Sequence, residues 1–323
     1  MTTNISTRAN FAHSRHRGFR VPNHYSAFNK EDLKTLGQSH EIEVHNARLL
    51  SPAPTVDSHG FQLVQWPTDV DLLDNDVVKT TFYGECRELI KHVRGCVEVR
   101  GGMHEYRNGF GGQKGPRGAK PTPNGSGGAY GMGIHSDMCA AIERHFDRIV
   151  PDQRHFESLN IWRSTDRENP VLMMPLAVCD MRSVQPSDIV FGDGTSTANI
   201  QQYMKVVDQR LIHSPQQRWY YFPEITPDEV LVFRQYDTRQ EELNLRTVFH
   251  QAVVDPTSDP DAPMRSSIEV RMQAIYNVES DKEERVKRFI AQVSDTYLDG
   301  RHCDWWSGPI ENYVPPMSAE SQA

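Results

Sequence analysis

Short strand-like runs separated by turns constrain the fold of this chain more than any other feature. In each run, apolar residues alternate with polar ones, or β-branched and aromatic side chains dominate, and turn-forming residues stand between the runs. The runs span residues 41–50, 60–66, 158–164, 171–180, 189–193, 217–223, 229–237, 246–254 and 266–278. Many short strands joined by loops favour a sandwich or barrel over a parallel βαβ sheet, and we expect a jelly roll.

Two further segments predict helices beside this β core. Residues 75–93 carry apolar side chains at helical spacing, and Gly95 follows where a helix would end. Residues 281–298 are charged but carry an apolar stripe, which is typical of a helix packed on the outside of a domain. The expected fold class is therefore mainly β with flanking helices (α+β).

The distribution of polar and turn-forming residues predicts the domain boundaries. Residues 1–20 and 316–323 are polar, so we expect a disordered arm and a disordered tail. Residues 21–315 are expected to form a single domain with its jelly-roll core at about residues 95–280. The stretch 101–133 is so dense in Gly and Pro that no regular element is expected in it, and residues 108–133 should form a mobile loop. Such a loop is either a lid over a site or simple disorder.

Charge and composition narrow the range of partners. The 35 Lys and Arg residues are outnumbered by 43 Asp and Glu residues, which leaves a net charge of −8 and no broad basic surface for nucleic acid. No run of about 18 apolar residues is present, so no membrane partner is expected, and a cytoplasmic location follows. The five cysteines are scattered without a C-x-x-C pair, which indicates reduced thiols.

His135 and Asp137 form a His-x-Asp pair that can supply two ligands of a non-haem iron centre. Such a centre needs two imidazoles and one carboxylate on the same face of the metal. In an extended segment, residues two apart point the same way, so both side chains can face one ion while Ser136 points away. The third ligand must come from a distant strand, and His250 follows a strand-like run. Taken singly, a histidine is more often a core or surface residue than a ligand.

Arg265 stands fifteen residues after His250, and Ser267 follows it. A dicarboxylate cosubstrate that chelates a metal through its keto-acid end needs a buried cation for its far carboxylate. The planar guanidinium suits this role, and a nearby hydroxyl can add a further hydrogen bond. Arg271 is a rival for the carboxylate, but it lies farther from His250 and has no hydroxyl two residues later.

The run 158–164 offers three more pocket residues. Asn160 and Trp162 share one face of a regular strand and are assigned to the cosubstrate. A core hydrogen bond is the simpler explanation for Asn160, and ordinary packing explains Trp162 equally well. Arg163 is assigned to the substrate, with packing outside the pocket as the alternative.

The span from His135 to Val278 resembles the fungal and bacterial hydroxylase/desaturase family of non-haem iron oxygenases, which includes a gibberellin desaturase and a cephamycin-biosynthesis component. The matching pieces are, in order, IHSD, NIWRS, PLAVCD, QRWYYFPEITPDEVLVFRQYD, FHQAVVDP and APMRSSIEVR. The resemblance implies a double-stranded β-helix, Fe(II) held by His135, Asp137 and His250, and 2-oxoglutarate held by Arg265 and Ser267. A His-x-x-Arg segment of that family also resembles residues 104–107, so His104 and Arg107 are expected to bind substrate.

The implied activity is that of a 2-oxoglutarate-dependent dioxygenase, an oxidoreductase of secondary metabolism. It would use Fe(II), 2-oxoglutarate and O2 to hydroxylate, desaturate or cyclise a natural-product or amino-acid-derived small molecule, with a ferryl species abstracting a hydrogen atom. One alternative is an iron oxidase that does not use 2-oxoglutarate, against which the Arg-x-Ser pair argues. The other is a jelly roll that binds a ligand without catalysis.

Overall fold

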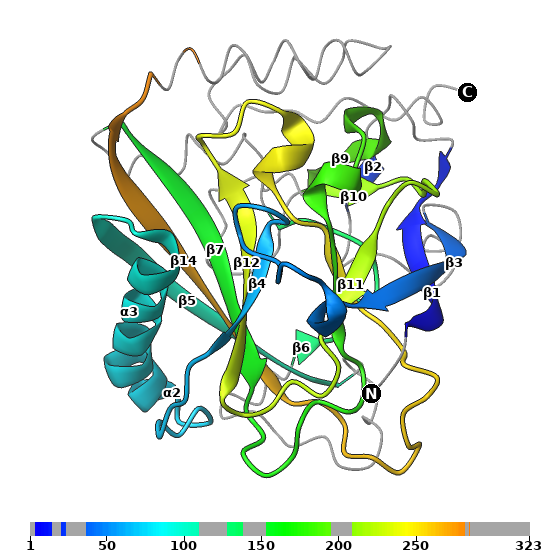
Figure 1. The fold of residues 1–323 in the computed structure, drawn as a ribbon, viewed down its shortest axis with the longest axis horizontal. Coiled ribbons are helices and arrows are strands. Elements are labelled where there is room, and N and C mark those ends of the chain that lie inside the picture. Colours follow the sequence, from blue (N-terminus) through cyan, green and yellow to red (C-terminus); the bar gives the residue numbers. More distant parts are fainter. Residues whose placement is uncertain are drawn as a thin grey trace.

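The computed structural model describes residues 4–14, 21–23, 37–109, 128–137, 153–194, 209–281 and 284, and these form a mainly β structure with one flanking helical segment (Figure 1). The longer strands are β1 (Ile5–Ala12), β3 (Gly37–Asn46), β4 (Phe61–Gln65), β5 (Glu98–Gly109), β7 (Arg154–Ser164), β9 (Ile189–Gly194), β12 (Glu229–Asp237) and β14 (Ser267–Glu279). The shorter strands are β2 (Val21–Asn23), β6 (Gly128–Ala129), β8 (Leu176–Cys179), β10 (Gln209–Leu211), β11 (Trp219–Tyr221) and β13 (His250–Ala252). Short 3₁₀ turns span Ala47–Leu49, Met181–Ser183, Pro186–Asp188 and Leu243–Arg246.

Two large sheets contain most of these strands. One has the order β1-β3-β11-β8-β13 and the other β4-β12-β7-β14-β5-β6, while β10-β9-β2 form a small third sheet. Side chains from both large sheets pack together in one buried cluster, in which Val178 and Tyr220 of the first meet Trp162 and Phe233 of the second. The apolar faces of the two sheets are thus buried against each other, as expected for a sandwich of antiparallel strands.

The helical segment predicted over residues 75–93 is confirmed. It comprises α2 (Asn75–Val77), a π-helical turn (Val78–Phe82) and α3 (Tyr83–Arg94). The Asp74 carboxylate caps the first turn, and Gly95 ends the helix with a left-handed φ of 59°. The buried face of α3 packs on β14 and β5, so the helix covers the outer side of the six-stranded sheet (Figure 1).

The expectation of a disordered arm over residues 1–20 is wrong for residues 5–12, because these form β1. The strand pairs antiparallel with β3 over its whole length, and Ile5, Ala9 and Phe11 are buried. The sheet core therefore begins well before residue 95. The side chains of Ser6, Arg8 and Asn10 are exposed and polar, so the alternation of period two was overlooked in the sequence.

The expectation that residues 101–133 contain no regular element is also wrong, because β5 runs through Gly109 and β6 lies at the end of this stretch. Gly101 and Gly102 have φ values of 80° and 142°, and the pairing of β5 with β14 shifts register beside them. A Cβ atom on Gly102 would lie 2.7 Å from the Tyr83 ring. The two glycines permit a bulge and a close approach of α3 rather than ending the strand.

Several predicted strands are shorter than expected. The run 171–180 contains only β8 at its end, and the run 246–254 contains only the three residues of β13. The remainder of the expected loop, residues 110–127, lies outside the described residues, as do the tail 316–323 and the expected helix 281–298 apart from its first residue and Glu284.

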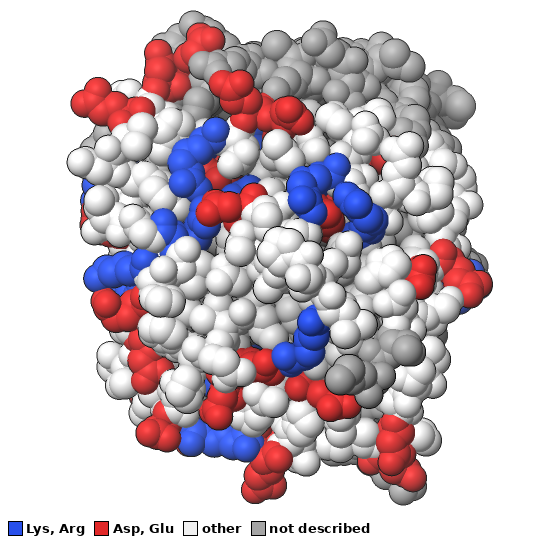
Figure 2. All heavy atoms as spheres, viewed as in Figure 1, with Lys and Arg blue, Asp and Glu red and all other residues white. Residues whose placement is uncertain are grey.

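Surface charge is mixed on the face seen in Figure 2, where basic and acidic side chains lie interspersed. Within the described part of the chain, no helix has the length and apolar character needed to cross a membrane.

We predict that Phe11→Ala lowers the free energy of unfolding by about 3–5 kcal/mol, because it empties a fully buried site in the cluster between β1 and its neighbours. Urea denaturation measures the change. Ser6→Ala, at an exposed position of the same strand, is the matched control and should change stability by less than about 0.5 kcal/mol. Equal effects of the two substitutions would contradict a structural role for β1.

Candidate active site

His135, Asp137 and His250 converge, and their nitrogen and oxygen ligand atoms all lie within 4.8 Å of one another. The backbones of His135 and His250 exchange two hydrogen bonds, with N–O distances of 3.2 and 3.0 Å, so the two residues lie on adjacent extended segments. Asp137 projects to the same side, with Oδ1 3.4 Å from Nε2 of His135. The intervening Ser136 is buried on the other side against Thr247. The alternation argued from the His-x-Asp spacing is therefore present.

Both imidazoles are oriented by backbone carbonyl groups. Nδ1 of His135 lies 2.7 Å from the Gly133 oxygen, and Nδ1 of His250 lies 3.3 Å from the Val248 oxygen. A carbonyl oxygen only accepts, so each Nδ1 carries the hydrogen and each Nε2 keeps its lone pair. Burial, reinforced by the nearby His135, lowers the pKa of His250 to about 3. His250 is thus neutral near pH 7, which is the form that binds a metal ion.

Asp137 is held by Arg271. Burial alone would raise the pKa of the Asp137 carboxyl, but the Arg271 guanidinium and the neighbouring His135 outweigh it and hold this pKa well below its ordinary value. Nη2 of Arg271 donates to Oδ2 of Asp137 at 3.1 Å. The carboxylate is therefore ionised and fixed on one side by a cation.

The segment that carries these ligands joins the two edge strands of the five-stranded sheet. Gly133 pairs with Asn10 of β1, and His135 pairs with His250 of β13. A Cβ atom on Gly131 would lie 3.0 Å from Cε1 of His135, so the absence of a side chain there allows the ring to pack closely. The N-terminal strand thereby helps to position the candidate metal ligands.

Arg265 is a buried cation without an anionic partner among the described residues. Its guanidinium carbon lies 4.4 Å from the centre of the Tyr130 ring and 5.3 Å from that of Trp162. Nη1 donates to the Met174 carbonyl, whereas Nε has no hydrogen-bond partner. Desolvation lowers the pKa of Arg265 to about 10, so the group is still charged near pH 7. A buried, charged guanidinium in such a setting favours a bound anion.

Asn160 and Trp162 share one face of β7, as the sequence predicted, and this is the inner face. Asn160 is fully buried, and within the described ranges neither its amide nitrogen nor its amide oxygen has a hydrogen-bond partner. Its cross-strand neighbours are Phe233, whose ring centre lies 4.8 Å from that of His250, and Arg271. The Asn160 amide therefore lies next to Phe233 and Arg271, which contact His250 and Asp137, respectively.

Two predicted substrate-binding residues are not part of this site. Arg163 points to the opposite face of β7, where it donates to the carbonyls of Trp66 and Pro227. His104 lies 2.8 Å from the Tyr83 hydroxyl and faces α3. The alternation of side chains along a strand sends these residues to the helix-covered side of the sheet, away from the three converging side chains. Their assigned roles in substrate binding stay predictions.

Arg107 and Ser267 lie next to each other on paired strands of the inner face. The Arg107 guanidinium binds Glu105, and the Ser267 hydroxyl donates to the Arg107 carbonyl at 3.4 Å. Their assigned roles stay predictions.

Sequence reasoning missed the network around Arg271, which includes Glu105 and Glu269. The signal was present in β14, where Ser267, Glu269 and Arg271 alternate with apolar residues and therefore point together toward the interior of the sandwich. It also missed Tyr130, whose ring packs against Arg265.

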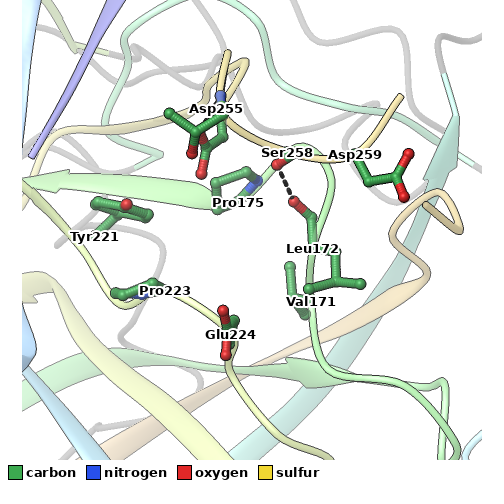
Figure 3. Close-up of a pocket in the computed structure, with 10 residues that line it drawn as sticks. Val171, Leu172, Pro175, Tyr221, Pro223, Glu224, Asp255, Ser258 and Asp259 are labelled. Atoms are coloured by element: carbon green, nitrogen blue, oxygen red, sulfur yellow. Dashed lines mark hydrogen bonds between the residues drawn. The ribbon is translucent and has the colours of Figure 1, made fainter. Parts of the chain in front are cut away.

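A separate pocket of about 180 Å³ lies where Pro175, Tyr221 and Asp255 come together (Figure 3). Its ten lining residues include Glu224, Asp255 and Asp259 but no lysine, arginine or histidine. This pocket thus lacks both a cation for a dicarboxylate and the imidazoles of a metal centre.

Comparison with known proteins agrees with the geometry. Residues 10–275 match the family model described as oxidoreductase/YMDC permease-like domain. The hydroxylase/desaturase efuI of Hormonema carpetanum is 30% identical over 67% of this chain and 77% of its own length. The Fe(II)/2-oxoglutarate-dependent dioxygenase nvfI of Aspergillus novofumigatus is 27% identical over 72% of this chain and 82% of its own length.

The fold has a counterpart among solved structures. The iron and alpha-ketoglutarate-dependent endoperoxidase NvfI superposes with a TM-score of 0.66 at 24% identity, covering 85% of this chain and 98% of that structure. The double-stranded β-helix expected from the resemblance is thereby confirmed. This chain belongs to the hydroxylase/desaturase family of non-haem iron, 2-oxoglutarate-dependent oxygenases.

Proposed function

We propose that this protein uses Fe(II), 2-oxoglutarate and O2 to oxidise a C–H bond of a small natural-product or amino-acid-derived molecule. His135, Asp137 and His250 would hold the iron, and Arg265 would bind the far carboxylate of 2-oxoglutarate. The observation that supports this most directly is a convergent set of two imidazoles and one carboxylate together with a buried guanidinium that has no acidic partner among the described residues.

The three side chains suit Fe(II). Two neutral imidazole nitrogens and one carboxylate oxygen form the donor set of non-haem iron oxygenases, in which the remaining positions on the metal stay open. Because both Nδ1 atoms donate to carbonyl oxygens, each Nε2 atom keeps a lone pair that can bind a metal ion. The ionised state of Asp137 supplies one negative charge toward the metal.

The surroundings suit a dicarboxylate cosubstrate. The aromatic rings of Tyr130 and Trp162 hold the Arg265 guanidinium and exclude water from it, which strengthens its attraction for a carboxylate. The Asn160 amide offers a donor and an acceptor that have no partner among the residues that the structure describes. Ser267 would add its hydroxyl on the same side of β14. An iron oxidase that does not use 2-oxoglutarate would have no use for this buried cation.

When bound, Fe(II) with 2-oxoglutarate and O2 supplies the oxidising power for removal of a hydrogen atom from substrate. The protein contributes position and a dry environment. The Phe233 ring packs against His250, and the Trp162 ring packs against Arg265. Both aromatic side chains are almost completely buried. Exclusion of water protects a reactive centre from side reactions.

We further propose that the enzyme acts in the cytoplasm and that Arg107, on the inner face of β5, contacts the substrate.

Anaerobic addition of Fe(II) and 2-oxoglutarate should produce a visible metal-to-ligand charge-transfer band, because the keto acid chelates the iron. The band is followed by absorption spectroscopy, and bound iron by metal analysis. His135→Ala is the control and should give neither the band nor stoichiometric iron. Iron uptake by the wild type that does not exceed that of the variant would rule out this metal centre.

Arg265→Met should weaken 2-oxoglutarate binding about 30-fold or more, since truncating one partner of a buried charge pair costs about 2 kcal/mol or more. Titration calorimetry with the metal-loaded protein measures the affinity. The matched ligand is 2-oxopentanoate, which keeps the keto acid and has a methyl group in place of the far carboxylate. Its affinity should be unchanged by the substitution, and a comparable loss for both ligands would contradict the assignment of Arg265.

Asn160→Leu should stabilise the ligand-free protein by about 1 kcal/mol or more, because it removes two buried polar atoms that have no partner. The same substitution should weaken 2-oxoglutarate binding. Urea unfolding and cosubstrate titration measure the two effects. A variant that is less stable and binds 2-oxoglutarate normally would place Asn160 in a core hydrogen bond instead.

A further inference from the structure

We propose that Arg271 is a positioning residue for Asp137, holding one carboxylate oxygen so that the other faces the two imidazoles. The inference rests on the proposed function, since it concerns a ligand of the same metal centre. Arg271 would orient a metal ligand, whereas Arg265 would bind the cosubstrate.

The two oxygens of Asp137 have different surroundings. Oδ2 accepts a hydrogen bond from Nη2 of Arg271 at 3.1 Å, while Oδ1 lies 3.4 Å from Nε2 of His135. A carboxylate bound in this way cannot rotate freely about its last side-chain torsion. One oxygen is thus directed toward the space between the imidazoles before any metal arrives.

Arg271 is itself held from two strands. Nη2 also donates to Glu269 at 2.5 Å, and Nη1 donates to Glu105 of β5 at 3.3 Å. Glu105 is held in turn by the Arg107 guanidinium. The Arg271 side chain is only 11% exposed, so its contacts are little screened by solvent.

This arrangement leaves Arg271 unsuited to the cosubstrate. Three carboxylates surround its guanidinium, whereas Arg265 has no carboxylate partner among the described residues. A dicarboxylate would have to displace one of them or approach the remaining negative charge. The contacts of Arg271 with three carboxylates therefore argue against Arg271 as the residue that binds the far carboxylate of 2-oxoglutarate.

Positioning and simple electrostatics predict opposite effects. A cation beside a metal site repels the metal ion, so by charge alone its removal should tighten metal binding. If instead the guanidinium fixes the ligand oxygen, its removal should weaken binding, and loss of a partner to a metal ligand typically costs about 10- to 100-fold in affinity. Arg271→Lys separates the two effects further, because it keeps the charge and loses the planar fork.

The test is a titration with Co(II) in the absence of 2-oxoglutarate, followed by the visible ligand-field spectrum. Arg271→Met and Arg271→Lys should both raise the dissociation constant about 10-fold or more and alter the spectrum of the bound ion. Arg265→Met should leave both unchanged. Tighter binding by Arg271→Met, or wild-type affinity and spectrum in Arg271→Lys, would overturn the proposal.

Controls guard against a general loss of folding. Arg48→Met removes another arginine with a carboxylate partner, Glu229, and should not affect Co(II) binding. Glu105→Gln leaves Arg271 in place and removes the charge of one anchor that is 40% exposed, so it should fold and weaken Co(II) binding several-fold. Unchanged binding in Glu105→Gln counts against the proposal. Failure of the wild type to bind any Co(II) would instead refute the metal centre itself, which distinguishes the two failures.

Discussion

The pair of backbone hydrogen bonds between His135 and His250 is the interaction on which the site depends. It brings together two residues that are more than a hundred positions apart and sets them on adjacent extended segments. Once this register is fixed, the alternation of side chains directs both imidazoles and Asp137 to one side. A shift of one residue in this pairing would turn the Ser136 side chain toward the candidate metal centre, and the side chains of His135 and Asp137 would point away from it. The metal geometry is thus a consequence of sheet register.

Two buried arginines near this bridge carry the same charge and meet different surroundings. Arg271 lies among three carboxylates, and Arg265 lies between two aromatic rings. A guanidinium compensated by acids can orient a neighbouring ligand, while an uncompensated one attracts an anion from solution. The different chemistry of Arg265 and Arg271 therefore comes from the residues around them, since Arg271 lies on β14 and Arg265 lies just before it.

The sequence was sufficient for the parts of the site that follow from local alternation. The His-x-Asp spacing placed two side chains on one face, and the run 158–164 placed Asn160 and Trp162 together on one face. The same alternation places Arg163, the residue after Trp162, on the opposite face. His104 was assigned from a motif resemblance, which carries no information about the face of a strand that a residue occupies. The strand β1 was missed because polar residues hid its alternation, and its role beside Gly133 depends on long-range pairing that a single sequence does not reveal.

Buried polar groups without a hydrogen-bond partner occur at several described positions, including both amide atoms of Gln235, and some of them lie near the candidate site. Some buried charges compensate one another, as where Arg94 and Arg234 share Glu157. Near the three converging side chains, the Asn160 amide and Nε of Arg265 have no hydrogen-bond partner in the described part of the chain, and desolvation makes such groups costly. A ligand that satisfies them recovers part of that cost on binding. Unpaired groups of this kind lower the stability of the ligand-free protein, and they raise its affinity for a ligand that satisfies them.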